Sequence, residues 1–175
     1  MTLSSPTSTP PDIVDQSVPL SPGQATHALR QQRAKVQAAT QASYEGLFSP
    51  EVQGLSLTER LLVGLHASHL CGAHSLAAHY RARLVEEWAP ALLVEAAGQV
   101  PAGAVDDARI QTILAFTATL IQRPLEGDRA AIQTLLAAGL STPAIVALGQ
   151  LIAFLSYQVR LTAGLQALAA LEAAA

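Results

Sequence analysis

The residue types best suited to chemistry are gathered in one short stretch of this sequence. Between residues 66 and 79 lie the only cysteine and four of the five histidines, namely Cys71, His66, His69, His74 and His79. A deprotonated cysteine is a nucleophile, and a nearby imidazole or helix N-terminus can lower the thiol pKa from about 8.5 toward neutrality. Histidine itself acts as a general acid or base. The stretch therefore predicts thiol chemistry at Cys71 or proton transfer at a histidine.

The helix that carries this cluster has a clear start. Residues 56–59 read Ser-Leu-Thr-Glu, a capping box in which the Ser56 oxygen accepts the amide of residue 59 and the Glu59 carboxylate accepts the amide of residue 56. Leucines follow at helical spacing, and Gly72 predicts a break before a second helix that starts at Ser75. Glu59 is therefore predicted to cap the helix, and a role as proton relay is the alternative.

A metal site is a further alternative for the histidines. His66 and His69 are three residues apart, so they share one helix face, and His74 could supply a third nitrogen ligand. The spacing matches no zinc signature, and no acidic residue lies between positions 60 and 85 to orient a ligand. The primary prediction is therefore that the protein holds no metal and no cofactor.

Residues 55–83, LSLTERLLVGLHASHLCGAHSLAAHYRAR, resemble the core motif of the AhpD-like and carboxymuconolactone decarboxylase (CMD) superfamily. Antioxidant members of that family carry Glu, eleven residues, CxxC, three residues and His. Aligned on Glu59, Cys71 matches the first cysteine, His74 replaces the second, and Ala78 falls at the histidine position. Aligned on His79 instead, Gly72 and Ser75 replace both cysteines and Arg60 replaces the glutamate. The cysteine pair is absent in either alignment.

The resemblance extends over roughly residues 12 to 170. It also rests on PGQATHALRQQR, QASYEGLF, LAAHYRARL and GLSTPAIVALGQLIAFLSYQVRLTAGLQAL, which are similar to a peroxidase-related CMD subfamily that lacks the CxxC pair. The resemblance implies an all-α, AhpD-like helical bundle that assembles as a homo-oligomer, from dimer to hexamer. Its catalytic residues would be Cys71, His79, His74 and Glu59.

Three functional hypotheses follow from these residues. The first is a peroxidase-related oxidoreductase in which Cys71 is oxidised and an outside thiol reductant restores it. The second is CMD-like proton transfer on a small lactone, with His79 or His74 as general base. The third is a non-catalytic oligomeric scaffold or small-molecule-binding module. Tyr157 and Arg160 of the last helix could face the same pocket, although a packed tyrosine and a surface arginine are the simpler expectation.

Composition limits the other classes of function. The net charge is −3, and the one lysine and nine arginines are scattered, which argues against nucleic-acid binding. No charged residue occurs from Ala130 to Val159, but Gly139 and Pro143 interrupt this run, so two core helices are expected rather than a membrane span. The N-terminus lacks a secretion signal, and a single cysteine forms no internal disulfide, so a cytoplasmic location is the default.

The remaining sequence predicts one helical domain. Residues 1–22 are expected to be a flexible tail and irregular arm, and residues 23–175 the AhpD-like domain. Within it we expect helices over about 24–47, from Asp106 or Asp107 to Pro124, and over 128–139. Thr142 and Pro143 then start the longest helix, about 144–171, which is apolar over so much of its circumference that it must be central or at an interface.

Overall fold

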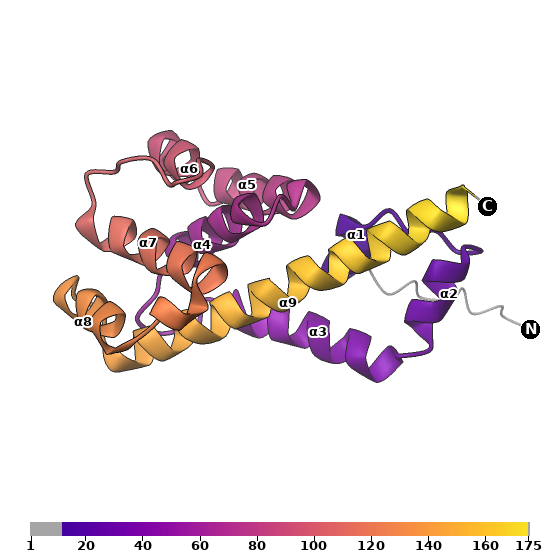
Figure 1. The fold of residues 1–175 in the computed structure, drawn as a ribbon, viewed down its shortest axis with the longest axis horizontal. Coiled ribbons are helices and arrows are strands. Elements are labelled where there is room, and N and C mark those ends of the chain that lie inside the picture. Colours follow the sequence, from indigo (N-terminus) through magenta and orange to yellow (C-terminus); the bar gives the residue numbers. More distant parts are fainter. Residues whose placement is uncertain (1–11, 175) are drawn as a thin grey trace, which may run out of the picture.

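The computed structural model describes residues 12–174, and this part of the chain is helical with no β-strand. Figure 1 shows its elements: α1 (Ile13–Ser17), α2 (Ala25–Gln31), α3 (Ala34–Leu47), α4 (Leu57–Leu70), α5 (His74–Glu86), α6 (Ala91–Ala97), α7 (Ala108–Gln122), the short 3-10 helix η1 (Pro124–Glu126), α8 (Arg129–Ala137) and α9 (Thr142–Ala173). The prediction of an all-α domain with a long C-terminal helix is confirmed.

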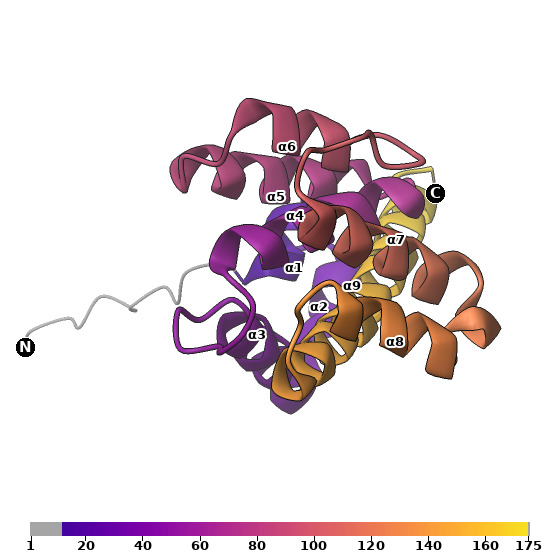
Figure 2. The ribbon, with the colours of Figure 1, turned by 90° about the vertical axis from the view of Figure 1, so that its left-hand side faces the viewer.

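Helix α9 runs along the whole molecule and connects its two ends. Helices α4 to α8 gather at one end of α9, and α1, α2 and α3 lie along the other part (Figures 1 and 2). The central element of the first group is α4, which packs against α5, α6, α7 and α9. Every residue of α4 from 60 to 68 is buried. The stretch that holds the histidines therefore begins inside the core and emerges from it only near residue 69.

Helix α9 has 32 residues and is about 48 Å long at the usual rise per residue. Ser141 rather than Thr142 is its N-cap, and Pro143 lies in its first turn. By length and composition the helix could cross a membrane, with a mean hydropathy of 1.5 and 44% of its most apolar window buried. The core helix of a soluble protein meets the same criteria, and α9 packs against α1, α2, α3, α4, α7 and α8.

The segment 12–22 differs from the irregular, flexible arm that we expected. The Asp12 carboxylate caps α1 by accepting the amides of Val14 (3.0 Å) and Asp15 (2.9 Å). Ile13, Val14 and Val18 are buried in the main core. Burial of these apolar side chains therefore holds the segment in place. The prolines and the shortness of the helix are the reason that the sequence did not predict it. The predicted tail at residues 1–11 lies outside the described residues.

Polar contacts join the N-terminal helices to one another and to the far end of α9. Arg30 of α2 pairs with Asp12 (2.8 Å) and with Asp15, and all three side chains are largely buried. At the far end of α9, the Glu172 carboxylate accepts the amides of Ala25 (2.6 Å) and Thr26 (3.0 Å), which caps α2. These two hydrogen bonds from backbone amides lower the pKa of Glu172. The helix expected over 24–47 is thus two helices, α2 and α3, because the chain turns at residues 32–33.

Candidate functional site

Glu59 stabilises the start of α4. Its Oε2 accepts the amide of Ser56 (2.7 Å), and the Ser56 Oγ accepts the amide of Glu59 (3.1 Å), so the predicted capping box is confirmed. Its Oε1 pairs with the Arg109 Nε of α7 at 2.6 Å. Helix geometry places Glu59 about 18 Å from the far end of α4, where Cys71 lies. Both carboxylate oxygens are thus used for structure, at a distance from the thiol.

Cys71 is the C-cap of α4 and is exposed. Burial of the thiol by the residues beneath it raises its pKa above the ordinary value, and the positive charge of Arg160 offsets only part of that effect. No imidazole contributes to this pKa. Cys71 also lines none of the four cavities described below, nor the one between residues 12 and 45, in the part of the chain that the structure describes. The thiol is therefore protonated at neutral pH and has none of the partners that would activate it.

Three of the four clustered histidines, His66, His69 and His74, lie in different surroundings. His66 is 1% exposed, and its Nδ1 donates to the Ala97 carbonyl oxygen at 3.0 Å, while burial lowers its pKa. The Nε2 of His69 is buried with no hydrogen-bond partner among the described residues, and burial lowers its pKa too. His74 is exposed at the start of α5. Within residues 12–174 no three His, Cys, Asp or Glu side chains are grouped to hold a metal ion, so the metal alternative gains no geometric support.

His79 belongs to a hydrogen-bonded chain that joins α5 to α3. Its Nε2 lies 2.7 Å from the Tyr44 hydroxyl oxygen, and that oxygen accepts a hydrogen bond from Arg83 Nη1 at 2.8 Å. Arginine can only donate, so the Tyr44 hydroxyl proton is available to His79 Nε2, and we assign the His79 tautomer protonated at Nδ1 on this basis. Burial, and secondarily the charge of Arg83, lower the pKa of His79 to about 4. His79 is therefore neutral at pH 7 and accepts the Tyr44 proton at Nε2.

This His79–Tyr44–Arg83 cluster borders a hollow on the surface. The hollow has a volume of about 430 Å³ and is lined by Tyr44, Phe48, Ser49, Pro50 and Arg83, together with Glu45. The Arg83 guanidinium lies 5.7 Å from the Tyr44 ring centre and 5.4 Å from that of Phe48, within the range of cation–π attraction. Burial raises the pKa of Tyr44 although Arg83 opposes it, so the phenol keeps its proton. The hollow thus combines a fixed cation with a hydroxyl that is hydrogen-bonded to a neutral imidazole.

Sequence reasoning selected His79 but missed its two partners. Arg83 follows His79 by four residues on one helix, a spacing that places both on the same face and could have pointed to it. Tyr44 lies on α3, far away in the sequence, and no local pattern connects it to His79. On α9, where we expected a packed tyrosine and a surface arginine, Tyr157 hydrogen-bonds Thr40 at 3.0 Å, and Arg160 is exposed and its charge acts on Cys71. Neither lines the hollow.

Comparison with known proteins does not assign the chain to a family. A scan against protein-family models finds no match for the chain, and a search of curated proteins finds no matching relative. The resemblance to the AhpD-like and CMD superfamily therefore stays a prediction from the residues quoted above. The candidate site rests on its own distances and charges.

Proposed function

We propose that this protein catalyses CMD-like proton transfer on a small lactone that carries a carboxylate, at the His79–Tyr44–Arg83 cluster. The observation that carries the proposal is the unbroken chain of hydrogen bonds from Arg83 through Tyr44 to His79, at 2.8 and 2.7 Å, in which Arg83 and Tyr44 line a surface hollow. A carboxylate is the natural partner for the guanidinium. The substrate would then lie against the Tyr44 hydroxyl.

The cluster can move a proton with every atom accounted for. The Tyr44 oxygen takes a proton from the carbon next to the lactone carbonyl while its own proton passes to His79 Nε2, leaving an enolate beside Arg83 and an imidazolium. Reversing these transfers at another carbon completes an isomerisation. A pKa of about 4 makes His79 a weak base in the free protein. Since Arg83 contributes to that low value, an anionic substrate that neutralises Arg83 raises the pKa of His79 and favours the transfer.

The peroxidase-related alternative has weaker support. It requires a thiolate, whereas the pKa of Cys71 is raised and no histidine assists it. Cys71 also sits at the C-terminal end of α4, where the negative end of the helix dipole disfavours a thiolate. A reaction with peroxide would therefore be as slow as that of an ordinary surface thiol.

Exchange of deuterium from solvent into a carboxylated five-membered lactone tests the proposal directly. We expect exchange with the wild-type protein and with Cys71→Ser, and a loss of about 10²-fold or more in His79→Gln and Tyr44→Phe. Arg83→Gln should raise KM more than it lowers kcat, because it removes the contact to the carboxylate. Undiminished exchange in His79→Gln, or no exchange in the wild type, would refute the proposal, and loss in Cys71→Ser would return the chemistry to the thiol.

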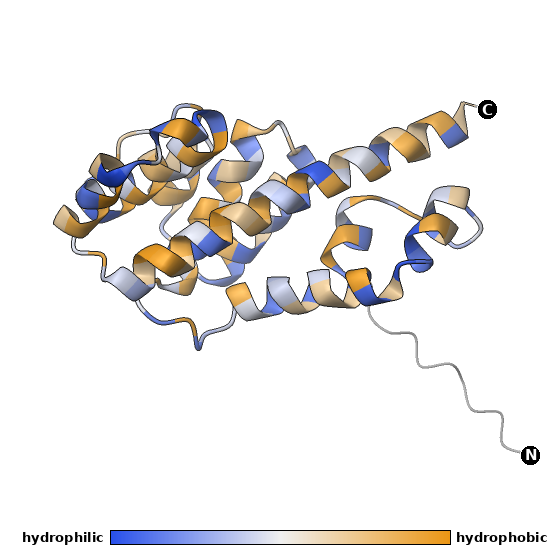
Figure 3. Cartoon of the chain, turned by 60° about the horizontal axis from the view of Figure 1, so that its bottom comes forward, coloured by the Kyte–Doolittle hydropathy of each residue, from blue (hydrophilic) through white to orange (hydrophobic). Residues whose placement is uncertain are grey.

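A second candidate function, the oligomeric scaffold, is favoured by one observation on α9. Figure 3 shows that the hydrophobic colour predominates along α9, with hydrophilic segments between. Its exposed side chains include Gln150, Gln166 and the charged Arg160, and at helical spacing the apolar or small residues Val146, Ala153, Tyr157, Gly164, Leu168 and Leu171. Two hollows of about 370 and 460 Å³ lie between α3 and α9 and share Ser43 and Phe154. A second copy of this mostly apolar face would fit against it about a two-fold axis.

Light scattering tests the scaffold against a matched control. Leu168→Glu places a charge on the uncovered face of α9, whereas Leu125→Glu places one on η1 at a side chain that is 97% exposed. We expect the wild type and Leu125→Glu to be dimers or larger and Leu168→Glu to be a monomer, since a buried unpaired charge is costly. A monomeric wild type would exclude the scaffold function.

A further inference from the structure

Trp88 is placed where neither folding nor packing in the isolated chain accounts for it. It follows α5 and adopts a left-handed backbone with φ of +54°, a position in the helix-ending turn that glycine usually fills. The turn is closed by bonds from the Trp88 amide to Val85 O (3.1 Å) and from the Ala89 amide to Leu84 O (3.0 Å). The side chain is 92% exposed. A bulky residue here strains the backbone and gains no burial in return.

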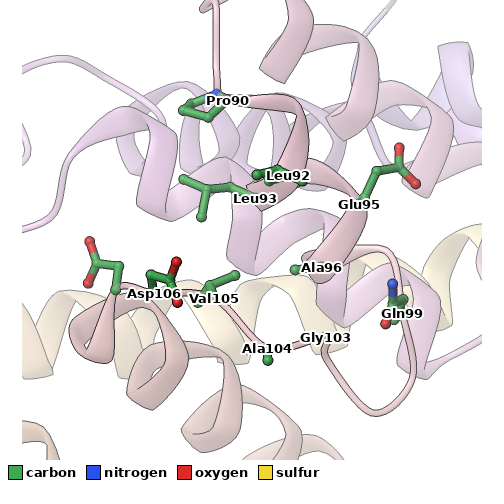
Figure 4. A pocket seen from close by; sticks show the side chains of 11 residues that line it. Pro90, Leu92, Leu93, Glu95, Ala96, Gln99, Gly103, Ala104, Val105 and Asp106 are labelled. Carbon is green, nitrogen blue, oxygen red and sulfur yellow. The ribbon is translucent and has the colours of Figure 1, made fainter.

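Other exposed apolar side chains lie close to this tryptophan in the sequence. Val85, on the last turn of α5, is 66% exposed, and Leu92, on the first turn of α6, is 83% exposed. Leu92 also borders a cavity of about 540 Å³ between α6 and the loop at residues 103–107, whose apolar wall includes Leu93 and Val105 (Figure 4). We call Val85, Trp88, Leu92 and this cavity the Trp88 surface. Its three exposed apolar side chains fall within residues 85–92, whereas the exposed apolar side chains of a monomer are usually scattered singly.

The charged side chains that line this cavity are all acidic. The charged residues that line the cavity are Glu95, Asp106 and Asp107, and Glu86 and Glu87 directly precede Trp88. Glu95 pairs with Arg81 at 2.6 Å, and Asp107 caps α7. Asp106, by contrast, has no ion pair or hydrogen bond to any residue in the range 12–174. Its carboxylate is therefore available beside the apolar wall.

We propose that the Trp88 surface binds an amphipathic segment of another protein, one that places apolar side chains in the cavity and Lys or Arg beside Asp106 and Glu87. We choose this partner because the charged side chains that line the cavity are all negative. A second copy docked about a two-fold axis would bring the same carboxylates face to face, and such like-charge contacts are unfavourable. An anionic lipid surface would be repelled in the same way. A segment with basic and apolar side chains can pair with the carboxylates and cover the exposed apolar side chains.

Trp88 is the only tryptophan in the chain, so its fluorescence reports on this surface alone. The probe is a synthetic Leu/Lys peptide of about five turns with leucines on one helix face. Its comparators are a Leu/Glu peptide of the same pattern and a Leu/Lys peptide of scrambled order. We expect a saturable shift of Trp88 emission to shorter wavelength at one peptide per chain with the first peptide only. No shift, or an equal shift with either comparator, would overturn the proposal.

Two variants separate binding from folding. With a dye-labelled Leu/Lys peptide, Trp88→Gly should weaken binding by about tenfold or more, while its melting temperature stays equal or rises because the strained turn is relieved. Asp106→Asn should weaken binding several-fold and Glu51→Gln, an exposed residue on another surface, should not. Wild-type affinity in Trp88→Gly would refute the proposal. A Trp88 emission shift that depends only on the protein's own concentration would assign the surface to a second copy and also refute it.

Discussion

The thiol and the imidazole on the hairpin of α4 and α5 have opposite surroundings. Cys71 lies exposed at the C-terminal end of α4, with Arg160 as its only charged influence and a raised pKa. His79, on the middle of α5, is half-buried and hydrogen-bonded to Tyr44, which is held in turn by Arg83. The more reactive residue type thus has the poorer environment. Tyr44, from the separate helix α3, makes the difference together with Arg83 of α5 itself.

The two positions also differ in what they do for the fold. Removing the Cys71 sulfur leaves no buried group without a partner, because the side chain is exposed. Removing a member of the His79 cluster leaves a half-buried donor or acceptor unpaired. Stability measurements can therefore distinguish the two regions before any substrate is known, and the three predictions below do so from the largest expected effect to the smallest.

The largest effect is the loss of stability in acid that originates at His79. Its pKa is about 4 in the folded protein and 6.5 in the unfolded chain, so the unfolded chain binds the extra proton between these values. The contribution of neutral His79 to the free energy of unfolding should therefore be fully present above about pH 6.5. The free energy of unfolding should then fall by on the order of 1 to 3 kcal/mol as the pH is lowered toward 4. Denaturant unfolding at several pH values measures it.

The matched variant for this prediction is His79→Gln, which should reduce the slope between pH 6.5 and 4. It should not abolish the slope, because burial also lowers the pKa of His66 and adds a contribution of the same sign. An NMR titration that places the pKa of His79 near 6.5 would contradict the prediction and remove the contrast with Cys71.

The second effect comes from the Tyr44 hydroxyl. Tyr44→Phe keeps the ring but deprives His79 of its donor and Arg83 of its acceptor, which should cost about 1 to 2 kcal/mol of stability. Cys71→Ser should change stability by less than about 0.5 kcal/mol. The same Tyr44 variant should raise the pKa of His79, because the lost bond favours the neutral imidazole. Equal losses of stability in Tyr44→Phe and Cys71→Ser would contradict the contrast between the two regions.

The smallest effect concerns the thiol pKa. Arg160→Gln removes the one charge that lowers the pKa of Cys71, so that pKa should rise further and alkylation at neutral pH should slow slightly. The pH dependence of the iodoacetamide reaction measures both proteins. A wild-type pKa below the ordinary value of about 8.5 would show an activated thiol and restore the peroxidase-related hypothesis.

Most of the helix boundaries could be predicted because their signals are local. The capping box at 56–59, the caps at Asp107 and Asp128, and Pro143 at the start of α9 each act within about four residues. Apolar periodicity then identified the long C-terminal helix. The buried helix α1 was missed because its evidence lies elsewhere in the chain, in the core that Ile13 and Val14 enter.

By itself the sequence determined an all-α fold, the ends of most helices and the gathering of reactive residues near position 71. Only the tertiary structure decided which of them have partners. Tyr44 of α3 meets His79 of α5 through the long side chains of both, and Glu59 pairs with Arg109 because α7 lies along α4. Caps and periodicity depend on neighbours along the chain, whereas the pKa of a side chain depends on burial and on charges brought from other helices.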